Sequence, residues 1–123
     1  FGKPIGKYEG IQFKLAEHHV RLQAVRELSN KALWTYDQEI KGKASRFDVS
    51  MAAAVAKSVA PLWAFDAIND VMQWQGAFGY TKECPDQRAL RGVRSFTLAE
   101  GSVEIMKLII ARELLGREFI AYR

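Results

Sequence analysis

The sequence predicts an all-α fold, an antiparallel up-and-down bundle of four helices. Apolar residues recur at spacings of three and four over long stretches, and no stretch shows sustained alternation with a period of two. The chain has 123 residues, of which 49% are hydrophobic and 26% are charged. This length and composition are typical of one compact soluble domain with a single core.

The longest helical pattern runs over residues 9–40. Its charged side chains fall mostly opposite one apolar stripe, as in an amphipathic helix. The polar stretch at 39–46 contains a glycine and several cations, and it predicts a helix end followed by a short exposed connection. The apolar stripe consists of Ile11, Leu15, His18, Leu22, Val25, Ala32 and Tyr36.

A second helix is expected to begin near Asp48 or Ser50, since either side chain can cap it, and to end at about Gln75. Its many alanines predict close helix neighbours. Pro61 lies inside this span and removes one backbone donor, so we expect a kink or a local disruption there.

Two further helices complete the bundle. Pro85 is expected to start a short helix that Gly92 ends, because proline is favoured in the first turn and glycine after the last. Ser102 can cap the last helix, whose apolar period continues until Gly116. Between the second and third helices, the two glycines at 76 and 79 break the helical period.

Composition excludes several classes of protein. No stretch approaches the ~20 uninterrupted apolar residues of a membrane span. Cys84 is a single cysteine and cannot form an internal disulfide, so a reducing compartment is expected.

His18 and His19 are adjacent, so their side chains point in different directions on a helix, and no metal site is predicted. Trp34, Trp63 and Trp74 are expected to be packing residues.

Charge and the first residues add two expectations. The 18 Lys and Arg against 14 Asp and Glu give a net charge of +4, a small excess that argues weakly against a nucleic-acid partner. The chain starts without an initiator Met and without a signal-peptide pattern, so we expect it to be a segment of a longer protein.

Two segments contain residues that helical packing leaves unexplained. Residues 73–80 combine an amide, Gln73, with glycines that permit close backbone approach to a ligand, although a helix C-cap explains the glycines equally simply. Residues 98–105 place Glu100 directly before a glycine and a helix N-terminus, where backbone N–H groups favour anions. A favourable interaction of Glu100 with the helix dipole is the simpler alternative.

Six segments in this order, taken together, resemble the C-terminal helical domain of the acyl-CoA dehydrogenases, and the likeness covers essentially residues 1–123. The segments are Phe1-Gly2-Lys3-Pro4-Ile5, Phe13-Lys14-Leu15-Ala16-Glu17, Gln73-x-x-Gly76-Ala77-x-Gly79-Tyr80, Pro85-x-x-Arg88-x-x-Arg91-x-x-Arg94, Ala99-Glu100-Gly101-Ser102-x-Glu104-Ile105 and Ile110-Ala111-Arg112-x-Leu114-Leu115-Gly116.

The resemblance implies a three-domain flavoprotein that oxidises the Cα–Cβ bond of an acyl-CoA thioester. It implies FAD as cofactor, an electron-transfer flavoprotein or similar acceptor, a homodimer or homotetramer, and a cytoplasmic location, or the mitochondrial matrix in a eukaryote. Glu100 matches the general base that removes the α-proton, a task for which burial makes a carboxylate a stronger base.

The resemblance also implies binding residues. The segment Gln73, Trp74, Gln75, Gly76 and Ala77 matches the part that reaches the FAD of a neighbouring subunit. Ser102 and Glu104 match flavin contacts, and Gly101 matches a position near the substrate thioester.

Two positions depart from the family pattern, and two alternatives stay open. Glu9 stands where related enzymes often have a Gln that contacts FAD, and Gly92 replaces the Asp of an Arg-Asp-x-Arg signature. A non-catalytic or DNA-associated member of the family is one alternative to a dehydrogenase. An acyl-CoA oxidase, which passes electrons to oxygen, is the other.

Overall fold

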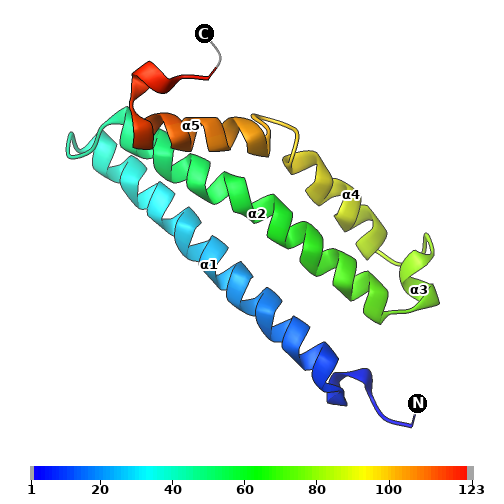
Figure 1. The fold of residues 1–123 in the computed structure, drawn as a ribbon. Coiled ribbons are helices and arrows are strands. Elements are labelled where there is room, and N and C mark those ends of the chain that lie inside the picture. The colour runs from blue at the N-terminus through cyan, green and yellow to red at the C-terminus, as the bar shows by residue number, and fades with distance from the viewer. Residues whose placement is uncertain (1, 122–123) are drawn as a thin grey trace.

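The computed structural model describes residues 2–121, and all of its regular secondary structure there is helical, which confirms the predicted fold class. The long helices α1 and α2 are antiparallel neighbours, and α4 and α5 follow each other end to end along the other side of α2 (Figure 1). The four main helices therefore occupy three rows. The elements are η1 (Ile5–Lys7), α1 (Glu9–Ile40), α2 (Arg46–Trp74), α3 (Ala77–Tyr80), α4 (Asp86–Phe96), α5 (Val103–Leu115) and η2 (Arg117–Phe119).

Helix α2 is the centre of the fold, since it contacts α1 on one side and α4 and α5 on the other. Its buried residues are small, namely Ala54, Ala56, Ser58 and Pro61. Small side chains let helix axes approach closely, as the alanine-rich sequence predicts. By length and composition alone, α2 is long and apolar enough to cross a membrane, a test that the core helix of a soluble protein also passes. Its position between two rows of helices accounts for apolar residues on more than one side.

The helix ends agree with the sequence in part. Helix α1 has the predicted bounds, and Ser102 caps α5 by accepting a hydrogen bond from the Ile105 N–H at 3.4 Å. The predicted start of α2 was wrong, because Ser45 is its N-cap. The Ser45 hydroxyl accepts from the Asp48 N–H, and the Asp48 carboxylate accepts from the Ser45 N–H. The Ser45 hydroxyl also donates to the Asp48 carboxylate at 2.7 Å, and this hydrogen bond, together with that from the Ser45 N–H, lowers the pKa of the Asp48 carboxyl.

Two predicted interruptions are absent from the helices. Helix α4 continues through Gly92 to Phe96, so Gly92 does not end it. Gly92 lies within the helix and has open space around it. Its φ angle is not in the left-handed region, so the position does not require a glycine. Helix α2 likewise runs without a break through Pro61, which is buried. Pro61 lines an apolar groove between α1 and α4.

Many apolar side chains of α1 are uncovered, because α2 is the long helix that packs against it. Leu15 and Tyr36, which the sequence assigns to the buried stripe, are exposed. Trp34, which is expected to be a packing residue, is 62% exposed and does not pack into the core of this chain. The exposed side chains of α1 include Phe13, Leu15, Val20, Leu22, Leu33, Trp34, Tyr36 and Ile40.

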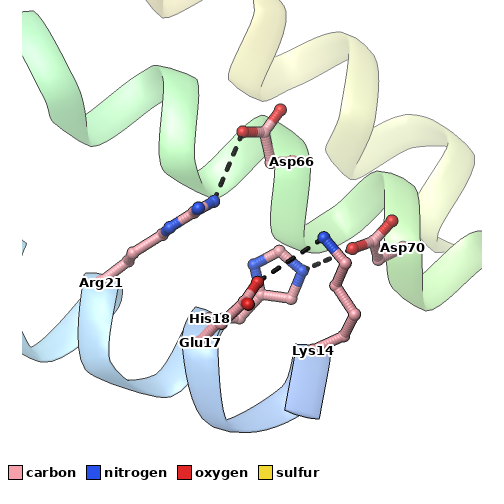
Figure 2. A network of polar contacts seen from close by, with 6 residues as sticks. All are labelled: Lys14, Glu17, His18, Arg21, Asp66 and Asp70. Atoms are coloured by element: carbon pink, nitrogen blue, oxygen red, sulfur yellow. Dashed lines mark hydrogen bonds and ion pairs between the residues drawn. The ribbon is translucent and has the colours of Figure 1, made fainter. Parts of the chain in front are cut away.

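A polar contact joins α1 to α2 inside their interface. His18 is only 5% exposed, and its Nε2 lies 2.7 Å from Oδ2 of Asp70, as Figure 2 shows. The ring of His18 also lies 6.3 Å from that of Trp74, measured between centroids. One turn further along, Arg21 and Asp66 form a looser and more exposed pair at 3.8 Å. The buried pair fixes the register of the two helices better than the exposed one.

We expect Asp70→Ala to lower the free energy of unfolding by about 1–3 kcal/mol, because it leaves the buried His18 Nε2 without its partner. The matched variant Asp66→Ala removes an exposed pair on the same helix and should change stability by less than about 1 kcal/mol. Unfolding followed by circular dichroism compares the two. Equal losses would show that the buried pair has no special role in joining α1 to α2.

Gly79 and Gly92 form a second matched pair. A Cβ at Gly79 would clash with the carbonyl oxygen of Met72, which is backbone and cannot move aside. We expect Gly79→Ala to destabilise the protein by about 1–3 kcal/mol through overpacking. Gly92→Ala should stabilise it by roughly 0.5–1 kcal/mol, since alanine is the better helix former in open space. Thermal unfolding gives both values, and a neutral Gly79→Ala would contradict the tight contact between α3 and α2.

Candidate functional site

The loop between α4 and α5 is tied down at both ends. Thr97 is 4% exposed, and its hydroxyl donates to the Arg94 carbonyl at 2.8 Å. The Thr97 carbonyl accepts from the Val103 N–H at 3.1 Å, which closes the loop onto the start of α5. The Ala99 N–H donates to the Ser95 carbonyl at 2.8 Å. The loop is therefore a defined turn between two helices.

Glu100 lies at the tip of this loop in a left-handed conformation, with φ of 57°. Among the described residues, Glu100 is the only non-glycine residue with a positive φ angle. This conformation costs an L-residue roughly 1–2 kcal/mol, and such strain concentrates at functional sites. Gly101 follows with φ of 90°, so the chain turns sharply just before α5. The Glu100 side chain is exposed in this chain and available to a ligand.

The first turn of α5 adds two polar groups beside Glu100. Ser102 caps the helix, and Glu104 is an exposed first-turn carboxylate. Hydrogen bonds from its own backbone N–H and from the Ser102 hydroxyl lower the pKa of Glu104, and the charges of Lys107 and Arg94 contribute in the same direction. This turn can accept hydrogen bonds through Glu104 and present backbone N–H groups to an anion. Contacts of Ser102 and Glu104 with a flavin, and of Gly101 with a thioester, stay predictions.

The second candidate segment surrounds a shallow polar hollow. Helix α2 ends at Trp74, and Gly76, with φ of 60°, turns the chain into α3. The hollow has a volume of about 220 Å³. It offers the amides of Asn69 and Gln73 together with glycine backbone, a donor and acceptor set that suits a nucleotide-like group. Its lining consists of Asn69, Met72, Gln73, Gly76, Gly79 and Tyr80.

The other residues of this segment have different surroundings. Trp74 packs toward His18 of α1, and Ala77 is exposed. The Gln75 side-chain amide donates to Asp86, and the fully buried thiol of Cys84 contacts Gln75 and Asp86 at 3.4 and 3.7 Å. Gln75 thus holds the turn between α2 and α4. Of the five FAD contacts predicted in this segment, Gln73 and Gly76 line the hollow.

The two candidate segments are separated by α4. That helix has 11 residues, which corresponds to roughly 16 Å at 1.5 Å per residue. Figure 1 shows the segment with α3 at one end of α4 and the loop to α5 at the other. A single small ligand cannot contact both, whereas an extended ligand or two separate ligands can.

Sequence analysis missed one residue that touches the Glu100 loop. Lys57 lies on α2, and its Nζ donates to the Ala99 carbonyl at 3.2 Å. The same ammonium lies 5.7 Å from the ring centroid of Phe96 at the end of α4. The two partners are 42 residues apart in sequence, so no local pattern could indicate this contact.

Comparison with known proteins identifies the family. The family model described as "Acyl-CoA dehydrogenase, C-terminal domain" matches residues 1–115. The 3-sulfinopropanoyl-CoA desulfinase of Paraburkholderia xenovorans (strain LB400) is 35% identical over 96% of this chain and 28% of its own length. An acyl-CoA dehydrogenase of Bacillus subtilis (strain 168) is 38% identical over 94% of this chain and 29% of its own.

A solved structure agrees with these relatives. It is described as the electron transferring flavoprotein of Acidaminococcus fermentans, in work on flavin-based electron bifurcation, and one of its chains matches with a TM-score of 0.83 and 31% identity. The match covers 94% of this chain and 28% of that one. The chain therefore spans less than a third of the length of the proteins it matches. By sequence and by fold, it belongs to the acyl-CoA dehydrogenase family and corresponds to the C-terminal helical domain.

Proposed function

We propose that, within the full-length protein, this chain supplies the general base and part of the cofactor site for FAD-dependent α,β-dehydrogenation of an acyl-CoA thioester. The observation that carries the proposal is the strained, exposed Glu100 at the N-terminus of α5. Family membership supports an oxidoreductase of this class. The desulfinase among the relatives is a reason to leave the acyl group undefined.

Glu100 would remove the α-proton of the bound thioester. The ionised carboxylate is the form of this side chain that accepts a proton. A bound thioester would exclude water from the exposed Glu100 side chain and strengthen it as a base. Gly101, with no side chain, would let the thioester approach the backbone beside the base.

The residues present fit part of an FAD site. The hollow beside Gln73 offers amide and backbone groups for the ADP portion, but about 220 Å³ is too small for the whole cofactor. Ser102 and Glu104 would contact the flavin portion. FAD, when bound, would supply the acceptor for the β-hydride. Because α4 separates the two segments, we infer that each contributes to a different FAD of an oligomer.

We further infer a homodimer or homotetramer, an electron-transfer flavoprotein or similar protein as electron acceptor, and a cytoplasmic or mitochondrial-matrix location. The uncovered apolar side chains of α1 support an assembly, since exposed apolar patches mark interaction surfaces. The structural relative described as an electron transferring flavoprotein supports the acceptor. The buried free thiol of Cys84 is compatible with a reducing compartment.

Replacing Glu100 with Gln in the full-length protein should leave FAD bound and lower turnover with acyl-CoA by about 10²–10⁴-fold, the usual contribution of a general base. The amide keeps the size of the side chain and removes its basicity. Anaerobic reduction of the flavin by an acyl-CoA series, followed by absorbance, measures the effect.

The control is Glu27→Gln, which changes the same charge on the exposed surface of α1 and should leave flavin reduction unchanged. A Glu100→Gln protein that retains yellow FAD and reduces it at nearly the normal rate would rule out Glu100 as the base.

A further inference from the structure

We propose that Lys57 is a positioning residue for Glu100, which it holds in its left-handed conformation through the peptide between Ala99 and Glu100. This inference rests on the proposed function of Glu100. The contact that carries it is the hydrogen bond of 3.2 Å from Lys57 Nζ to the Ala99 carbonyl.

The carbonyl of Ala99 belongs to the peptide plane that precedes Glu100. Rotation of this plane about the N–Cα bond of Glu100 is the φ angle of Glu100, which is 57°. A group that holds the Ala99 carbonyl therefore resists the rotation that would relax Glu100 toward negative φ. An L-residue favours the relaxed conformation, so a restraint is needed.

Ala99 is held from two sides. Its N–H donates to Ser95 of α4, and its carbonyl accepts from Lys57 of α2. The hydrogen bond between Thr97 and Val103 closes the loop at its base but leaves the peptide at its tip free to rotate. Lys57 supplies the long-range restraint at this tip, because it comes from the central helix and not from the loop or its flanking helices.

The surroundings of Lys57 make this restraint specific to a cation. Its side chain lines an apolar groove between α1, α2 and α4, so the carbon stem is directed along the groove toward the loop. The ammonium lies 5.7 Å from the Phe96 ring centroid, a cation–π distance, and bonds the Ala99 carbonyl with a charge-assisted hydrogen bond. An arginine can reproduce both contacts, whereas an uncharged side chain cannot.

The test compares Lys57→Met, Lys57→Gln and Lys57→Arg in the full-length holoenzyme, with Lys31→Met as the control. Met keeps the length and apolar character of the stem and removes the donor. Lys31 is exposed on α1, so its variant loses the same charge away from the loop and should behave like the wild type.

We expect Lys57→Met to slow flavin reduction by acyl-CoA about 10–100-fold with little change in KM, because a small displacement of the base affects proton transfer more than binding. The primary deuterium isotope effect at the substrate Cα should rise. Amide hydrogen exchange at residues 98–102 should increase while that of α1 stays unchanged. Lys57→Gln should show the same changes, and Lys57→Arg should restore rate and protection to within about threefold of wild type.

Glu100→Gln is measured in parallel to separate the two proposals. Normal rates and normal exchange in Lys57→Met and Lys57→Gln, with an inactive Glu100→Gln, would overturn the role of Lys57 and leave that of Glu100 intact. An active Glu100→Gln would overturn both. Slow reduction in Lys57→Met that Lys57→Arg does not rescue would also overturn the positioning role.

Discussion

The structure depends on the packing of α2 between two rows of helices. Its buried residues are small, so α1 on one side and α4 with α5 on the other can approach its backbone. The turn after α2 and the loop between α4 and α5 are both placed relative to this helix. The buried pair of His18 and Asp70 fixes the register of α1 on α2, and Gly79 permits α3 to fold back onto Met72.

This arrangement explains why the candidate base is held in a strained loop. The carbonyl of Thr97 joins the end of α4 to the start of α5, and Lys57 reaches across from α2 to Ala99. The second contact requires α4 and α5 to be packed on α2. The left-handed Glu100 is thus a product of tertiary packing, although a capping residue and a glycine at the adjacent positions make the turn possible locally. The site is preorganised by the fold before any ligand arrives.

The arrangement also leaves an apolar surface without a partner in this chain. A helix at the edge of a three-row layer has one covered side, and the opposite side of α1 displays Phe13, Val20 and Trp34. This chain spans less than a third of the length of its relatives, and the remaining parts of such a protein can cover this surface. Helix α4 also separates the two candidate cofactor segments. This separation fits the proposed assembly, in which each segment contributes to a different FAD.

Local signals in the sequence were sufficient for much of the fold. The period of α1 gave both of its ends, and Ser102 and Gly116 marked those of α5, because each acts on its own helix. Where two local signals competed, the prediction failed. Ser45 capped α2 in place of Asp48 or Ser50, and Gly92 stayed helical because no turn was needed there. The exposure of Trp34 and the contact of Lys57 depend on neighbours distant in sequence, and no periodicity encodes them.

The central claim is that Glu100 exchanges a proton with the α-carbon of a thioester. The most direct measurement uses the full-length protein in deuterium oxide with an acyl-CoA analogue that has an α-hydrogen but no β-hydrogen, so that proton transfer proceeds without oxidation. Mass spectrometry should show deuterium entering the analogue at Cα with the unaltered protein and at least about 100-fold more slowly with Glu100→Gln. Equal exchange rates in the two proteins would contradict the assignment of Glu100 as the base.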